Sequence, residues 1–226
     1  MSNAPRVAGF KEISFWQEDG IGVITILSDD QGRVSLLFFE EFLKAISLAI
    51  TDDKVKAVAI TGSNDNFLTG LRKVESNQSV KYLDMVSTVA SFIAMINKPV
   101  FTLVNGTCID LGVELTLLSD VCIARDGAKF EISESYIPVM GLSHTVMKYP
   151  VFVNGVSREG KNCDVIFPEE IFLDKANDFI LSNIKEYMSI ARRERLGDVN
   201  GTLSKERSIY LTNYFMKQNS QKENAK

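Results

Sequence analysis

The spacing of hydrophobic and polar positions alternates along the chain between a strand pattern and a helical pattern. Apolar segments at 13–16 and 21–27 are separated by the turn sequence Glu18-Asp19-Gly20, which predicts a hairpin. Further apolar runs of strand type lie at 56–60, 100–104, 121–124 and 129–132, and runs of helical spacing lie at 36–50, 82–96 and 112–118. Because strands and helices alternate from about residue 13 to residue 132, the pattern predicts an α/β fold with parallel β-α-β crossovers.

The remainder of the chain has a predominantly helical pattern. Pro168-Glu169-Glu170 predicts the start of a long helix, since proline fits the first helical turn and acidic residues favour the positive end of the helix dipole. Ser204 is a candidate cap for one more helix that reaches about Met216, and the polar end of the chain is expected to fray. We therefore divide the chain into an α/β core at 1–145 and a C-terminal region at 146–226 with a loop and helices.

Composition and charge narrow the class of protein. The 226 residues are 45% hydrophobic and 24% charged, which is typical of a globular domain with a well-filled core. The formal net charge of −4 argues against a nucleic-acid-binding protein, because phosphate binding depends on clustered positive charge. We find no apolar run of the roughly 20 residues that a membrane span needs, and no secretory signal. We therefore expect a cytoplasmic protein that does not enter the membrane.

Several kinds of site are excluded by the residues that the chain lacks. Its single histidine, His144, cannot form a site with two histidine ligands, and no metal site is predicted. The three cysteines are widely spaced and fit buried thiols in a reducing compartment. The sequence Gly141-Leu142-Ser143-His144-Thr145 comes nearest to a nucleophile elbow, but it lacks the final glycine that permits the tight turn.

Two acidic residues are the candidates for catalysis. A predicted strand and the turn Asn105-Gly106 lead into a helix whose first turn carries Glu114, and Glu134 follows twenty residues later. The free N–H groups at a helix start favour an oxygen that gains negative charge, such as a thioester oxygen becoming an enolate. Two carboxylates across one pocket can divide acid and base roles. An acid in a first helical turn is also a common surface residue matched to the helix dipole.

Taken together, these motifs resemble those of the crotonase superfamily, the enoyl-CoA hydratase/isomerase fold. Its members typically read Lys-Pro, a strand, Asn-Gly, Gly-Gly-Gly-Cys-Glu-Leu and then Asp, with Phe-x-x-Pro-Glu downstream. The matching residues here are Lys98-Pro99, Asn105-Gly106, Gly112-Val113-Glu114-Leu115, Asp120, Phe130 and Glu134. Upstream, the strand that ends at Thr61-Gly62 and the sequence Phe67-Leu68-Thr69-Gly70-Leu71 match the strand and first CoA loop of the family.

The resemblance implies an α/β fold with a crotonase-like β-β-α superhelical core and a C-terminal helical region that forms trimers, commonly paired as hexamers. It implies an acyl-CoA substrate and no cofactor beyond the coenzyme A that the substrate carries. The backbone N–H groups of Leu71 and Leu111 would form the oxyanion hole for the thioester carbonyl. Residues Thr69, Gly70, Arg72 and Lys73 would contact coenzyme A.

For the reaction, the resemblance implies hydration of a 2-enoyl-CoA, because both acids are retained. Glu114 would activate the water, and Glu134 would handle the proton at the α-carbon. An enoyl-CoA isomerase needs only one carboxylate and is the second interpretation. A non-catalytic CoA-binding or scaffold member of the fold is the third.

Three segments of the chain depart from the family pattern. Asp110-Leu111-Gly112 replaces the glycine triplet, so Asp110 either caps the helix or directs its carboxylate at the pocket, where it would oppose an enolate. Arg72 replaces the usual aspartate, and Arg72 and Lys73 are either phosphate ligands or solvated surface charges. Ser133 stands in place of proline.

Overall fold

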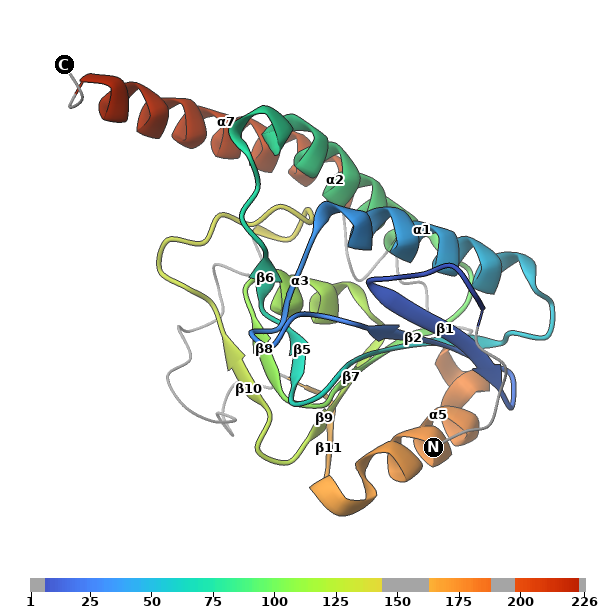
Figure 1. The fold of residues 1–226 in the computed structure, drawn as a ribbon. Helices are drawn as coiled ribbons and strands as arrows, with labels where there is room; N and C mark the ends of the chain where they lie inside the picture. The colour runs from blue at the N-terminus through green and yellow to red at the C-terminus, as the bar shows by residue number, and fades with distance from the viewer. Residues whose placement is uncertain (1–6, 144–162, 188–197, 224–226) are drawn as a thin grey trace.

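The computed structural model describes residues 7–143, 163–187 and 198–223, and a six-stranded sheet forms its centre (Figure 1). The strand order is β1-β2-β4-β7-β9-β11. Only the β1–β2 pair in this sheet is antiparallel, which confirms the predicted hairpin and the parallel crossovers. The strands are β1 (Ile13–Glu18), β2 (Ile21–Ile26), β4 (Ala57–Gly62), β7 (Val100–Val104), β9 (Val121–Arg125) and β11 (Val165–Phe167).

Two small parallel sheets lie beside the large one, and both involve predicted site segments. One has the order β10-β8-β5, and the other pairs β3 with β6. These strands are β3 (Arg33–Val34), β5 (Asn66–Leu68), β6 (Gly70–Leu71), β8 (Thr107–Ile109) and β10 (Lys129–Glu131). The chain thus repeats a unit of two strands and a helix. In each unit the first strand belongs to the large sheet, and the second lies outside it, next to the start of a helix.

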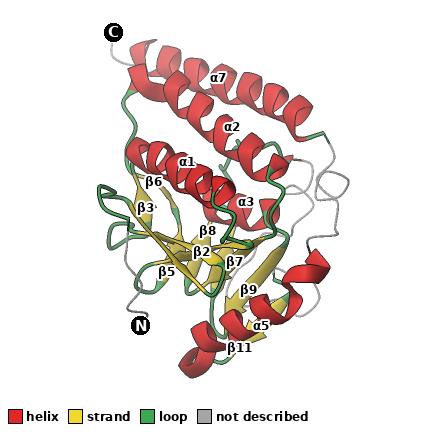
Figure 2. Cartoon of the chain, turned by 90° about the vertical axis from the view of Figure 1, so that its right-hand side faces the viewer, coloured by secondary structure: helices red, strands yellow, loops and turns green. Residues whose placement is uncertain are grey.

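Helices cover both faces of the large sheet. Figure 2 shows α1, α2, α3 and α7 on one side of the sheet and α5 on the other. These helices are α1 (Leu36–Thr51), α2 (Ser79–Met95), α3 (Leu111–Leu118), α5 (Phe172–Tyr187) and α7 (Val199–Glu223). Short 3₁₀ turns, Ser76–Gln78 and Glu169–Ile171, precede α2 and α5. Ser35 caps α1 as its hydroxyl accepts the Leu37 N–H at 3.2 Å.

Alternate residues of the strands enter two separate hydrophobic clusters. On β4, Val58 and Ile60 join the larger cluster under α1, α2 and α3, whereas Ala57 and Ala59 join a smaller cluster under α5. Burial of both faces explains why this strand reads as a continuous apolar run. Among the described helices, none is long and apolar enough to cross a lipid bilayer.

The C-terminal helices differ from their predicted boundaries. The helix predicted from Ser204 begins at Val199 and continues to Glu223, and the Ser204 hydroxyl donates to the Asn200 carbonyl within that helix. Asp198 caps the start of this helix instead, because its carboxylate accepts the Gly201 N–H at 2.9 Å. The prediction was wrong because a serine inside a helix resembles a cap in sequence.

Two aromatic residues of the C-terminal helices pack against the rest of this chain. Phe172 belongs to the cluster under α5, and the Tyr210 ring lies 6.0 Å from the Tyr82 ring on α2. Figures 1 and 2 both show α7 running alongside α2. His144 and the loop predicted at Tyr149–Lys161 lie outside the described residues.

Candidate functional site

Three glycines allow one loop to lie against the start of α3. A Cβ added at Gly62 or Gly106 would lie 1.9 or 2.0 Å from a backbone oxygen of the loop at 63–68. A Cβ at Gly112, on the first turn of α3, would lie 2.1 Å from the Leu68 carbonyl oxygen. Only glycine permits these approaches. The contact at Gly112 therefore holds β5, and the residues that follow it, against the N-terminus of α3.

The two predicted oxyanion donors lie on either side of this contact. Leu111 is the first residue of α3, where backbone N–H groups have no acceptor within the helix. Leu71 follows Gly70, whose φ of +131° is a conformation that favours glycine. The next N–H along the chain, that of Arg72, donates to the Val34 carbonyl at 2.8 Å and so anchors this loop to β3.

Glu114 is fully buried, and its carboxylate is occupied by donors from one short segment. The Tyr136 hydroxyl donates to it, and so do the N–H groups of Val139 at 3.0 Å and Met140 at 3.1 Å. Burial raises the pKa of Glu114 to about 7, the three hydrogen bonds oppose that rise, and the nearby Glu206 carboxylate adds to it. Glu114 thus holds the segment at 136–140 in place.

Glu206 on α7 is a second buried carboxylate that the sequence analysis missed. It accepts the N–H groups of Gly141 and Ser143, both at 2.6 Å. Glu114 and Glu206 together therefore bind four backbone N–H groups within the five residues 139–143. The sequence carries no signal for this role, because Glu206 lies in a helix rich in polar residues and its partners are more than sixty positions away.

Glu134 has a different environment, because it is exposed in the turn that follows β10. The residue before it, Ser133, donates its backbone N–H and its hydroxyl to the Asp110 carboxylate at 2.7 and 2.9 Å. Asp110 makes no side-chain bond to the helix start, so neither the predicted cap nor an open carboxylate is found. Its φ of +51° directs the side chain toward β10 instead.

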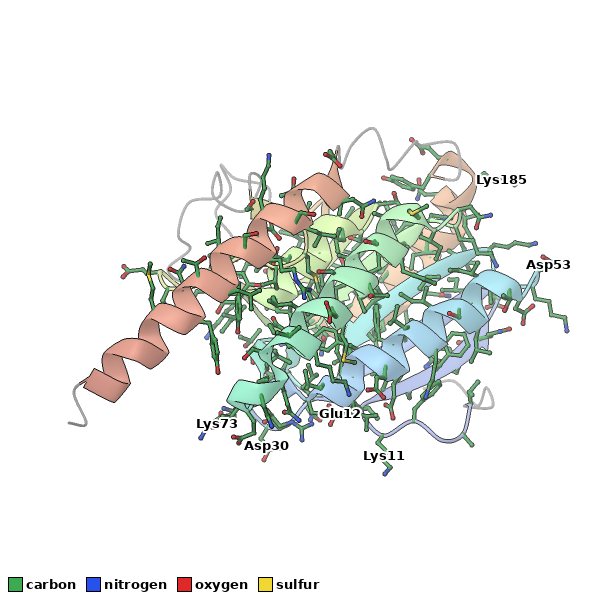
Figure 3. All side chains as sticks on the ribbon, turned by 90° about the horizontal axis from the view of Figure 1, so that it is seen from above. Lys11, Glu12, Asp30, Asp53, Lys73 and Lys185 are labelled. Atoms are coloured by element: carbon green, nitrogen blue, oxygen red, sulfur yellow. The ribbon has the colours of Figure 1, made fainter. Side chains whose placement is uncertain are left out.

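The residues predicted to contact coenzyme A differ in the contacts that their side chains make within the chain. The Arg72 guanidinium is paired with Glu12, which also accepts the Ser35 N–H at 3.0 Å. The Thr69 hydroxyl donates to the Gln31 carbonyl at 2.5 Å. Lys73 is exposed and points outward at the edge of the molecule (Figure 3). Arg72 is thus an exposed arginine paired with Glu12, and Lys73 is an exposed lysine that points outward.

A cavity of about 650 Å³ lies elsewhere, between α5 and the face of the sheet opposite α3. Its apolar wall includes Trp16, Val23 and Phe172, and Arg125 lies at its polar end. The predicted site residues, all within the described part of the chain, do not line this cavity. Among the described residues, no group of three or more histidine, cysteine or acidic side chains is placed to hold a metal ion.

Comparisons with curated proteins give relatives of low identity. The chain is 27% identical over 117 residues to an enoyl-CoA hydratase of Alternaria alternata, which covers 49% of this chain and 40% of that protein. It is 25% identical over 131 residues to a trans-2-decenoyl-[acyl-carrier-protein] isomerase of Streptococcus mutans, which covers 54% and 50%. The alignments thus span about half of the curated relatives' lengths or less.

Solved structures share the fold over more of the chain. An enoyl-CoA hydratase from Mycobacterium avium subsp. paratuberculosis superposes with a TM-score of 0.72 at 18% identity, over 89% of this chain and 93% of that one. One from Geobacillus kaustophilus gives 0.73 at 14% identity, over 92% and 91%. The family model for enoyl-CoA hydratase/isomerase matches residues 17–152, more than half of the chain. This match and the crotonase architecture show that the chain belongs to the enoyl-CoA hydratase/isomerase family.

Proposed function

We propose that this chain binds an acyl-CoA thioester and transfers a proton at the carbon next to its carbonyl. The N–H groups of Leu71 and Leu111 would hold the carbonyl oxygen as it becomes an enolate oxygen. The observation that carries this proposal is the contact of Gly112 with the Leu68 carbonyl, which keeps the two donor segments together. The curated relatives, hydratases and isomerases of enoyl thioesters, support this class of substrate.

The different environments of the two acids favour isomerisation of a 3-enoyl-CoA. Glu134 is exposed, whereas Glu114 is fully buried and holds three donors. A single carboxylate suffices for isomerisation: Glu134 removes a proton from C2 and the electrons move onto the thioester oxygen. The double bond then forms between C2 and C3 as the same proton returns to C4. Glu114 would support this reaction by holding the segment at 136–140.

Hydration of a 2-enoyl-CoA is the second candidate function. The observation in its favour is the Glu114 pKa of about 7, which suits a general base at neutral pH. Hydration requires Glu114 to exchange one of its present donors for a water. The two reactions therefore differ in whether Glu114 or Glu134 takes the first proton.

Absorbance of the conjugated enoyl thioester distinguishes the two reactions. Isomerisation of a short 3-enoyl-CoA raises this absorbance, whereas hydration of a 2-enoyl-CoA lowers it. We expect Glu134→Gln to reduce isomerisation by about a hundredfold or more, within the range for a lost general base. Glu131→Gln is the matched control, because Glu131 is an exposed glutamate on the same strand-turn segment.

Two results would contradict the preferred reaction. Hydration that depends on Glu114 and is retained in Glu134→Gln would reverse the assignment of the two acids. Binding of coenzyme A in calorimetry, without turnover of either substrate, would leave the non-catalytic member of the fold as the correct interpretation.

A further inference from the structure

Two of the departures from the family motif contact each other. Asp110 stands where the motif has glycine, and Ser133 stands where it has proline. The Asp110 carboxylate accepts the Ser133 N–H at 2.7 Å and the Ser133 hydroxyl at 2.9 Å. Proline has neither donor and glycine has no acceptor side chain, so the motif's own pair cannot form this contact.

Each departure on its own would be unfavourable. A side chain at φ +51° is in a strained conformation that glycine would adopt freely, although aspartate tolerates it better than most residues. A serine at 133 with glycine at 110 would lose the acceptor for both of its donors. The strain at 110 is therefore offset by hydrogen bonds that exist only when both residues are present.

The contact extends the pairing of β8 with β10 beyond the ends of the strands. The register aligns Ile109 with Glu131, and the Asp110 N–H donates to the Glu131 carbonyl at 2.9 Å. The two bonds from Ser133 follow directly. We call these three hydrogen bonds the 110–133 clasp.

The clasp joins the residues that immediately precede two groups of the proposed site. Leu111, a proposed oxyanion donor, follows Asp110, and Glu134, the proposed proton carrier, follows Ser133. The three hydrogen bonds of the clasp thus connect the start of α3 to the turn after β10. Glu134 lies in an exposed turn, and in this chain the clasp fixes the backbone directly before it relative to the start of α3.

We propose that Asp110 and Ser133 form a coupled positioning pair that sets Glu134 relative to the Leu111 N–H. This inference rests on the proposed function. Neither residue is assigned contact with the substrate, and both act through their neighbours. The negative charge of Asp110 is directed at the two Ser133 donors. This contact explains how an acidic residue can lie next to Leu111, a proposed oxyanion donor.

A set of four variants tests the coupling. Ser133→Pro removes both donors and Asp110→Gly removes the acceptor, so we expect each to lower kcat by about tenfold or more with little change in KM, as misplaced groups do. Asp110→Asn can still accept the N–H and can donate to the hydroxyl, so it should stay close to the native rate. The double variant Asp110→Gly with Ser133→Pro restores the motif's own pair and should recover most of the rate lost in Ser133→Pro.

Asp164→Ala is the matched control for a merely structural contact. Asp164 also accepts a backbone N–H through its carboxylate, that of Cys122 at 2.8 Å, where β11 meets β9. We expect this variant to lower Tm without lowering kcat. The clasp variants should lower kcat by more than any change in Tm explains.

The outcomes separate the two proposals. If the native chain turns over neither a 2-enoyl-CoA nor a 3-enoyl-CoA, the proposed function fails and the clasp has no reaction to serve. If the native chain is active, the positioning role fails when the single variants keep the native rate. It also fails when the double variant is as slow as Ser133→Pro, or when kcat follows Tm in every variant, Asp164→Ala included.

Discussion

The buried carboxyl group of Glu114 should make the stability of the fold depend on pH. Its pKa rises from 4.5 to about 7 in the folded chain, mainly because burial disfavours the charged form. A folded-state pKa above the unfolded value means that the folded chain binds more protons between these two pH values. The free energy of unfolding should therefore fall as pH rises from 4.5 through 7 and level off above that range.

The expected magnitude follows from the size of the pKa difference. One pKa unit corresponds to about 1.4 kcal/mol, so the rise from 4.5 to about 7 amounts to about 3 kcal/mol. The groups that face Glu114 are Tyr82 on α2, Glu206 on α7 and Tyr136 in the loop after β10. The shift therefore belongs to a buried cluster and should appear in equilibrium unfolding of the whole chain.

The assay is urea unfolding from pH 4 to pH 8, followed by the fluorescence of the single tryptophan, Trp16. Glu114→Gln keeps an acceptor oxygen but cannot ionise, so other titrating groups cancel in the difference between variant and native chain. Relative to the variant, the native chain should lose about 3 kcal/mol between pH 4 and pH 8. Glu134→Gln, at an exposed position, serves as control. A difference that stays constant across this range would refute the reasoning.

Three further predictions follow from the contacts of the site. Glu206→Ala should lower the free energy of unfolding by about 2–4 kcal/mol, because it leaves the buried Gly141 N–H and the partly buried Ser143 N–H without this acceptor. Faster amide exchange at 139–143 would locate the effect. Gly112→Ala should lower the free energy of unfolding by at least about 1–3 kcal/mol in denaturant unfolding, because its Cβ would overlap the Leu68 carbonyl. An unfolding midpoint equal to that of the native chain would contradict this packing. Lys73→Ala should raise KM for an acyl-CoA more than Arg72→Ala does, because the arginine is already paired, and the effect of Lys73→Ala should shrink as salt is added. Equal KM effects at all salt concentrations would argue against a phosphate contact at Lys73.

Local patterns in the sequence were sufficient for most of the α/β core. The hairpin, the parallel strands of the large sheet and the helices α1, α2 and α3 depend on periodicity and turn residues, and these signals lie within the elements themselves. The helix predicted at 36–50 is α1, Leu36–Thr51, with Ser35 as its cap. The start of α7 was misplaced because the true cap, Asp198, and Ser204 carry equally good local signals.

The contacts of the site were beyond local patterns. Whether Glu114 faces a substrate or a protein segment depends on Tyr136, Val139 and Met140, and no spacing rule connects them to it. The pairing of Arg72 with Glu12 joins residues sixty positions apart. Sequence patterns therefore identify the candidate residues, and the fold determines which donors each carboxylate binds.

The bond from α7 to the segment at 141–143 has a consequence for how the chain is made. Glu206 is synthesised after the large sheet and the helices α1 to α5, yet it accepts two N–H groups of a segment that leaves the ribosome about 65 residues earlier. Until α7 emerges and packs along α2, that segment has two backbone donors without their final partner. We expect the candidate site to become ordered only after α7 has been made, so that translation stopped before α7 yields a sheet and helices without a finished site.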